Sequence, residues 1–250
     1  MSALAISSTA FAFVFGGALF GMFLRTVLPE HHLSNDSKDV VKLGMGLVAT
    51  MSALVLSLLI SSAKGSFDAQ SAEIIEASAK IILLDRALAL YGPEANEARA
   101  LLHSSVAVTY ERMWPKDGSP SLSKEPPPGM ESVYVKIQEL SPKEDRQRSI
   151  QGQALGILVG LGQMRWLMYE QESASISMPL LIILVSWLTT LSISFGMFAP
   201  HNATVIASLF VSSLSVAAAI LLILELYNPY GGLIHISSAP MRAALERLGQ

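Results

Sequence analysis

Between Ser173 and Leu224 the chain runs for 52 residues without a single Asp, Glu, Lys or Arg. This run is interrupted once, by the polar segment Ala199-Pro200-His201-Asn202. A helix rises about 1.5 Å per residue and the hydrocarbon core of a bilayer is roughly 30 Å thick, so each half is long enough to cross it. The run therefore predicts two membrane-spanning helices joined by a tight turn.

Two further spans are expected near the beginning of the sequence. Met1 to Leu24 carries no charged side chain, and the uncharged segment Leu43 to Ala63 lies between Lys42 and Lys64. The alternative for the first segment is a cleaved signal peptide. It lacks a basic start, however, and its apolar stretch exceeds the usual length of about 7–15 residues. We expect an uncleaved span, in which the G-x-x-x-G pair of Gly17 and Gly21 packs against another helix.

Composition agrees with a membrane protein and excludes several functions. Hydrophobic residues make up 51% of the chain and charged residues 15%. The net charge of −3 and the lack of a basic stripe argue against a nucleic-acid partner. The chain has no Cys, which excludes disulfides, thiolate zinc sites and a cysteine nucleophile. We expect an all-α integral membrane protein whose first partner is the lipid bilayer.

Four spans give the chain a two-plus-two organisation. The expected parts are a first transmembrane pair (1–63), a helical block (64–172), a second transmembrane pair (173–227) and a tail (228–250). An even number of spans places both termini and the block on one side of the bilayer. Basic residues near the span ends do not decide which side this is.

The central block has the patterns of helices. Apolar residues recur at helical spacing from Phe67 to Tyr91, and Gly92-Pro93 is typical of one helix ending and the next beginning. Ser141-Pro142-Lys143-Glu144 predicts a capping box that opens a helix reaching at least Tyr169. The interior glycines of that helix predict close packing of another helix, and they are Gly152, Gly156, Gly160 and Gly162.

The tail ends in a short amphipathic pattern. Met241, Ala244, Leu245 and Leu248 fall on one face. Such a helix can lie on a membrane surface or dock on the central block. Its charges are few and mixed, which favours docking.

No group of residues has the pattern of a catalytic or metal site. The nearest candidate is His31-His32 with Asp36 and Asp39, and a solvated loop explains it better than a metal site. The carboxylates of the block alternate with basic residues, as they do on a wet helical bundle. We therefore expect neither an enzyme nor a bound metal or cofactor.

The second span carries a stripe of small and hydroxyl-bearing residues at steps of three and four. We call this set the hydroxyl stripe, and its members are Gly46, Thr50, Ala53, Ser57, Ser61 and Lys64. Hydroxyls on a membrane helix can line a water-filled path, since they replace part of an ion's hydration. Small residues also let helices approach closely, and Ser or Thr can bond to its own backbone. The spacing leaves pore lining and packing both open.

A turn follows the fourth span. Glu225 is the carboxylate at its end, and a Glu there must be wet or paired. Pro229 stops the helix and two glycines allow a sharp turn. This segment is our candidate for coupling the spans to the helical block, and an ordinary helix end is the alternative. Its residues are Glu225, Asn228, Pro229, Tyr230, Gly231 and Gly232.

Three segments together carry a family resemblance. Glu225 to Pro240 has an acidic residue, a Pro-aromatic-x-Gly turn and a Ser-rich stretch ending in Pro. It resembles a signature of the bestrophin-like membrane family of bacteria and plants. Gly46 to Lys64 resembles the second span of that family. Leu84 to Glu94 resembles its D-x-x-L-x-x-Y-G-P-E helix junction.

The resemblance implies a distant similarity to bestrophins, which are oligomeric anion channels. Bestrophins have four spans per subunit, a cytoplasmic helical region and a pore lined by the second span of five subunits. The resemblance thus implies a homo-oligomer, pentameric by analogy, in a bacterial plasma membrane with the block and termini cytoplasmic. The carboxylates of the bestrophin calcium site have no counterpart at Asn228, Tyr230 and the neutral run 233–236.

The function we expect is an oligomeric bestrophin-like channel for small ions, with anions as candidates. The alternative is a non-conducting membrane scaffold or regulatory subunit that binds a partner through its helical block. A transporter is a third option. The number of subunits in the purified protein separates the first two, because a pore of this type needs a ring of copies.

Overall fold

The computed structural model describes residues 2–29, 35–115, 129–172 and 177–249. These residues form helices, and none of them lies in a strand. The elements are α1 (Ala3–Val27), α2 (Asn35–Tyr91), the 3₁₀ helix η2 (Pro93–Ala95), α3 (Asn96–Met113), α4 (Met130–Gln138), α5 (Asp145–Glu172), α6 (Met178–Phe198), α7 (Ala203–Leu226) and α8 (Ala239–Arg247). The His31-His32 pair lies outside the described residues.

The helices form two compact units. Met1–Ser66 and Ser175–Tyr227 make up the first, which we call the membrane unit. Phe67–Ala174 and Asn228–Gln250 make up the second, which we call the helical block. Four helices are long and apolar enough to cross a bilayer, namely Ala3–Val27, Lys38–Tyr91, Met178–Phe198 and Ala203–Leu226. The predicted all-α architecture with four candidate spans is confirmed.

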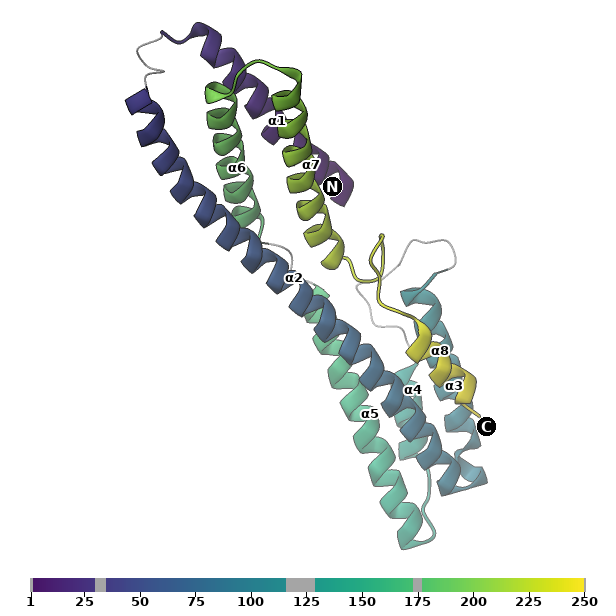
Figure 1. Ribbon diagram of the computed structural model, residues 1–250. Coiled ribbons are helices and arrows are strands. Elements are labelled where there is room, and N and C mark those ends of the chain that lie inside the picture. Colours follow the sequence, from purple (N-terminus) through teal and green to yellow (C-terminus); the bar gives the residue numbers. More distant parts are fainter. Residues whose placement is uncertain (1, 30–34, 116–128, 173–176, 250) are drawn as a thin grey trace. The chain divides into compact units, whose positions relative to one another are not determined.

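The membrane unit is held together by a close crossing of α1 and α6 (Figure 1). A Cβ placed on Gly21 would lie 2.0 Å from the backbone oxygen of Ile193. A Cβ on Gly196 would likewise lie 2.0 Å from the backbone oxygen of Ala18. Real atoms do not approach this closely, so only glycine fits at either position. The packing role predicted for the G-x-x-x-G pair is confirmed, and Gly196 is its partner on the facing helix.

Helix α7 packs on α1 as well. The rings of Phe11 and Phe15 each meet the ring of Phe210 edge-on, with centroids 5.5 and 5.4 Å apart. Farther along, Ala10 of α1 forms one apolar cluster with Leu181 of α6 and Ile220 of α7. Edge-to-face aromatic pairs are worth about 0.5–1.5 kcal/mol beyond the area they bury. These aromatic pairs therefore favour contact between α1 and α7 over contact of either helix with lipid.

The turn between α6 and α7 follows the sequence expectation. Helix α6 ends at Phe198, and the side-chain oxygen of Asn202 accepts a hydrogen bond from the Val205 amide at 2.8 Å. This is the standard N-cap arrangement, which satisfies one amide of the first turn. The Arg25 guanidinium at the end of α1 donates to the Ala199 carbonyl. The charged end of the first span is therefore tied to the turn of the second hairpin.

The helix predicted from Phe67 to Tyr91 is present, and it is continuous with the helix of the second span. Helix α2 runs without a break from Asn35 to Tyr91 and contributes residues to both units. Lys64, Gly65 and Ser66 join the expected span to the expected helix, and they include no proline. One interior glycine costs a helix only about 1 kcal/mol, which is too little to end it here.

The capping box predicted at Ser141 is wrong. Helix α5 begins at Asp145, and the Glu144 carbonyl accepts its first hydrogen bond, from the Arg148 amide. The Gln147 side chain reaches back and accepts from the Lys143 amide at 2.8 Å. Gln147 thus supplies the side-chain acceptor that the sequence pattern assigned to Glu144. The helix does extend beyond Tyr169, as expected.

The glycines of α5 do not serve the close helix packing that we expected. A Cβ added at Gly152, Gly156 or Gly162 would meet nothing within 4 Å, and at Gly160 it would meet only the Lys80 amine. The buried face of α5 is the apolar side opposite them, with Ala154, Leu158 and Leu161 in the core. Within one chain the glycine face stays open.

The core of the helical block is built from α2, α3, α4, α5 and α8. Leu84, Leu88, Leu102 and Ile137 are among its fully buried side chains. Helix α8 joins this core through Met241 and Ala244, and Leu248 directly after the helix joins it too, which confirms docking of the tail on the block. The tail is therefore part of the folded body.

A single methyl group tests the α1–α6 crossing. Gly21→Ala should lower the midpoint of thermal unfolding in detergent, because overpacking costs about 1–3 kcal/mol. Gly16→Ala is the matched control on the same helix, since its Cβ would meet nothing within 4 Å. It should leave the midpoint unchanged or raise it, because Ala is the better helix former. Equal midpoints for the two variants would contradict the close approach of α1 and α6.

Candidate functional site

All six residues of the hydroxyl stripe are exposed in the structure. The buried face of this part of α2 lies on the other side of the helix and includes Ser52, Leu59 and Ala63. The stripe is therefore turned away from the other helices of its own chain. Packing within the chain, one of the two explanations left open by the sequence, does not account for it. The remaining candidates for what the stripe meets are water, lipid and another copy of the chain.

The exposed hydroxyl oxygens of the stripe can accept hydrogen bonds. The Thr50 hydroxyl donates to the Gly46 carbonyl at 2.9 Å, which uses its proton and leaves oxygen lone pairs facing outward. Gly46 itself leaves open space, because a Cβ added there would meet nothing within 4 Å. A hydrated ion or a chain of waters could therefore approach the helix backbone here.

A row of leucines lies beside the hydroxyl stripe. Leu43, Leu47, Leu54 and Leu58 are each more than 60% exposed, and they recur at helical spacing. Large apolar side chains at this exposure suit lipid or a neighbouring helix. Helix α2 therefore presents two adjacent surfaces of opposite character, one able to bind water and one that avoids it.

One polar contact ties the end of this segment to the second hairpin. The hydroxyl of Ser62 lies 3.2 Å from the hydroxyl of Tyr227, the residue that follows α7. Glu225, two residues before the last residue of the membrane unit, is only 8% exposed. The carboxylate at the end of α7 is thus buried within the chain, and its role in coupling stays a prediction.

The turn after α7 is well defined within the helical block. The Gly231 amide donates to the Asn228 carbonyl at 3.3 Å, and the Ile236 amide donates to the Pro229 carbonyl at 2.8 Å. Gly232 has a φ of +97°, a conformation that side chains with a Cβ rarely adopt. The sequence left the choice between Gly231 and Gly232 open, and only Gly232 has positive φ.

Trp114 anchors this segment, and sequence reasoning missed it. Its indole Nε1 donates to the Ile236 carbonyl at 3.0 Å, and its ring meets Tyr230 edge-on with centroids 6.1 Å apart. Ile236 is buried beside Ile74 and Met113. The position of Trp114 at the end of α3 was visible in the sequence. Its partner lies 122 residues away, and no local pattern identifies it.

The D-x-x-L-x-x-Y-G-P-E segment performs a structural task. Asp85 receives two hydrogen bonds from Arg99, at 2.8 and 3.0 Å, and its side chain is 5% exposed. The bond to Asp85 raises the pKa of Arg99. Gly92 has a φ of +127°, which allows α2 to reverse into η2 and α3. The acidic residue and the glycine thus fix one helical hairpin of the block.

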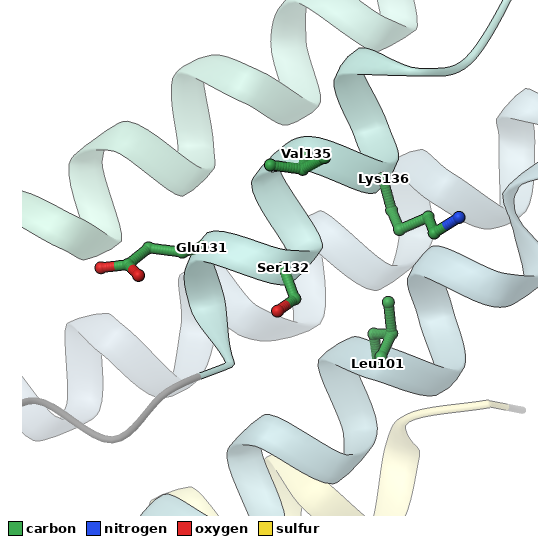
Figure 2. A pocket seen from close by; sticks show the side chains of 5 residues that line it. All are labelled: Leu101, Glu131, Ser132, Val135 and Lys136. Atoms are coloured by element: carbon green, nitrogen blue, oxygen red, sulfur yellow. The ribbon is translucent and has the colours of Figure 1, made fainter.

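The surface of the block has a shallow groove of about 310 Å³ between α3 and α4 (Figure 2). Leu101 of α3 and Glu131, Ser132, Val135 and Lys136 of α4 line it. Lys136 lies within 3.3 Å of both Glu97 and Glu139, and these bonds raise its pKa. With its charge matched by two carboxylates, Lys136 does not make the groove an anion site.

No metal centre is formed by the part of the chain that the structure describes. Groups of three or more His, Cys, Asp or Glu side chains able to hold an ion are absent among those residues. Two candidate sites remain. They are the hydroxyl stripe on α2 and the turn that follows α7.

Comparison with known proteins now identifies the family. The sequence profile of the Bestrophin-like domain matches residues 12–241, nearly the whole chain. The chain belongs to the bestrophin-like family. The match covers the described parts of α2 and the turn after α7, and so includes both candidate sites of this bestrophin-like chain. No curated protein and no solved structure gives a match.

The turn can be tested with two neighbouring glycines. Gly232→Ala should destabilise the segment after α7 by about 1–2 kcal/mol, because a Cβ is strained at positive φ. Faster amide hydrogen exchange over residues 233–240 would report this loosening. Gly231→Ala is the matched control and should exchange like the parent protein. Similar exchange in both variants would contradict the turn geometry.

Proposed function

We propose that the chain is one subunit of an oligomeric ion channel whose water-filled path is lined by the hydroxyl stripe. The observation that carries the proposal is the outward orientation of this stripe on a helix able to span the membrane. Family membership supports it as well. Because the stripe faces away from its own chain, several copies must surround a path for the hydroxyls to line it.

Small anions are the substrates we propose. Lys64 is the charged residue of the stripe, and it stands one residue beyond the expected span at Ala63. A ring of ammonium groups at a pore mouth raises the local concentration of anions. Water and salt screen this effect at an exposed position, with a Debye length of about 8 Å at physiological ionic strength. The preference should therefore be modest.

We further propose that the helical block and both termini are cytoplasmic. This orientation rests on family membership, since the basic residues at the span ends do not decide it. Reporter tags inserted after Glu125 and after Gln250 should both respond as cytoplasmic. Reporters on opposite sides would contradict the four-span topology, and two external reporters would contradict the orientation alone.

The number of subunits and ion flux together test the channel. The protein purified in mild detergent should have the mass of a ring of copies, and liposomes that contain it should release chloride. A strict monomer would rule out this type of pore. An assembled protein that passes no ions would favour the non-conducting scaffold.

Selectivity is measured in the same liposomes. Lys64→Glu should move the reversal potential towards cation preference, because it replaces a ring of positive charge by a negative one. Lys42→Glu is a suitable control, since Lys42 is exposed on α2 before the expected span. A conducting Lys64→Glu protein with an unshifted potential would remove Lys64 from the path.

A further inference from the structure

The helical block is joined to the membrane unit at three points of the chain, and one apolar cluster of the block gathers residues from beside all three. The chain crosses between the units at 66–67, 174–175 and 227–228. Phe67, Met168 and Tyr230 lie within six residues of these points, and each packs against the same cluster. Its buried members are Ile74, Met113 and Ile236. We call this part of the block the tethered end, because six residues of chain reach at most about 20 Å.

Three large apolar side chains are exposed at the tethered end. Leu233 is 78% exposed, and Trp166 and Leu167 in the last two turns of α5 are 60 and 56% exposed. Each lies within three residues of Met168 or Tyr230 in the sequence. A single exposed leucine is ordinary on a protein surface. Three such residues beside the links to the spans, one of them Trp, have the composition of a membrane interface, where Trp is enriched.

The turn that carries Leu233 is fixed at its base. The Ile236 amide donates to the Pro229 carbonyl at 2.8 Å, and the Trp114 indole donates to the Ile236 carbonyl at 3.0 Å. Gly232, directly before Leu233, has the positive φ that turns the chain. Because the fold already orders this backbone, Leu233 loses little freedom when it enters an apolar surrounding.

We propose that the tethered end rests on the bilayer, with Leu233, Trp166 and Leu167 inserted at the boundary between the lipid headgroups and the acyl chains. Apolar side chains bind at this depth because they leave water, and the amphipathic ring of Trp suits the headgroup level. The proposal goes beyond ion conduction, and it holds equally for a non-conducting protein. The turn after α7 then serves as a second attachment of the block to the membrane, besides the covalent one.

Lipid is favoured over a second copy of the chain as the cover of this surface. Three covalent links hold the tethered end near the bilayer whatever the number of copies. Charges of both signs stand directly beside the cluster, with Arg112 before Met113 and Asp68 after Phe67. Such a mixture gives no strong attraction to anionic headgroups. Insertion into neutral phosphatidylcholine is therefore expected.

Spin labels test the insertion, because the chain has no cysteine of its own. Leu233→Cys and Trp166→Cys are labelled with a nitroxide in liposomes of neutral phosphatidylcholine. Both labels should collide severalfold more often with oxygen, which concentrates in lipid, than with a water-soluble nickel chelate.

Val135→Cys is the matched control, an apolar residue of the same block that is 48% exposed. Its neighbour Lys136 contacts Glu97 in the first turn of α3, whereas Met113 of the cluster ends that helix. Val135 thus lies towards the other end of a helix about 27 Å long. Its label should collide mainly with the nickel chelate.

Each other outcome has a definite meaning. A label at Leu233 or Trp166 that the nickel chelate reaches as readily as the Val135 label would overturn the proposal. A label shielded from both reagents would overturn it too, because protein, such as a second copy, would then cover the surface. Chloride flux in the same liposomes keeps the two proposals apart. Inserted labels in a protein that passes no ions would contradict the channel alone, and wet labels in a conducting protein would contradict the insertion alone.

Discussion

The backbone contact between α1 and α6 is the constraint on which the membrane unit depends. Lipid tails are as apolar as the side chains they would replace, so helices in a bilayer associate through close packing and not through the hydrophobic effect. Gly21 and Gly196 let the two backbones touch, each filling the space beside a carbonyl of the other helix. Helix α7 packs on α1 as well, so α1 is in contact with both helices of the second hairpin. The hydroxyl stripe of α2 is left facing outward.

Much of this arrangement follows from local physical rules. Length without charge is enough to predict spans, because a bilayer has a fixed thickness. The glycine pair at Gly17 and Gly21 predicts a close helix contact, and Asn202 before an apolar run is a typical helix start. Gly92-Pro93 similarly marks the reversal between α2 and α3. Each of these signals lies within a few residues of the feature it predicts.

The features that sequence could not supply depend on distant partners or on competition between neighbours. Nothing near Trp114 indicates that its indole will bind the Ile236 carbonyl. The residues from Ser141 to Glu144 have the sequence of a capping box. In the structure the backward bond is made by Gln147, whose side-chain oxygen accepts from the Lys143 amide. The expected first transmembrane pair ends at residue 63, yet the helix continues beyond it to Tyr91. The exposure of the hydroxyl stripe was likewise undecidable from spacing, because pore lining and packing require the same small residues.

The discontinuous core of the helical block has a consequence for biosynthesis. Met241, Ala244 and Leu248 complete a core whose other members precede α6 in the chain. During translation these residues emerge only after the second hairpin has been made. The core of the block can therefore be completed only after α6 and α7 have been synthesised, and until then the apolar surface that Met241, Ala244 and Leu248 cover stays open.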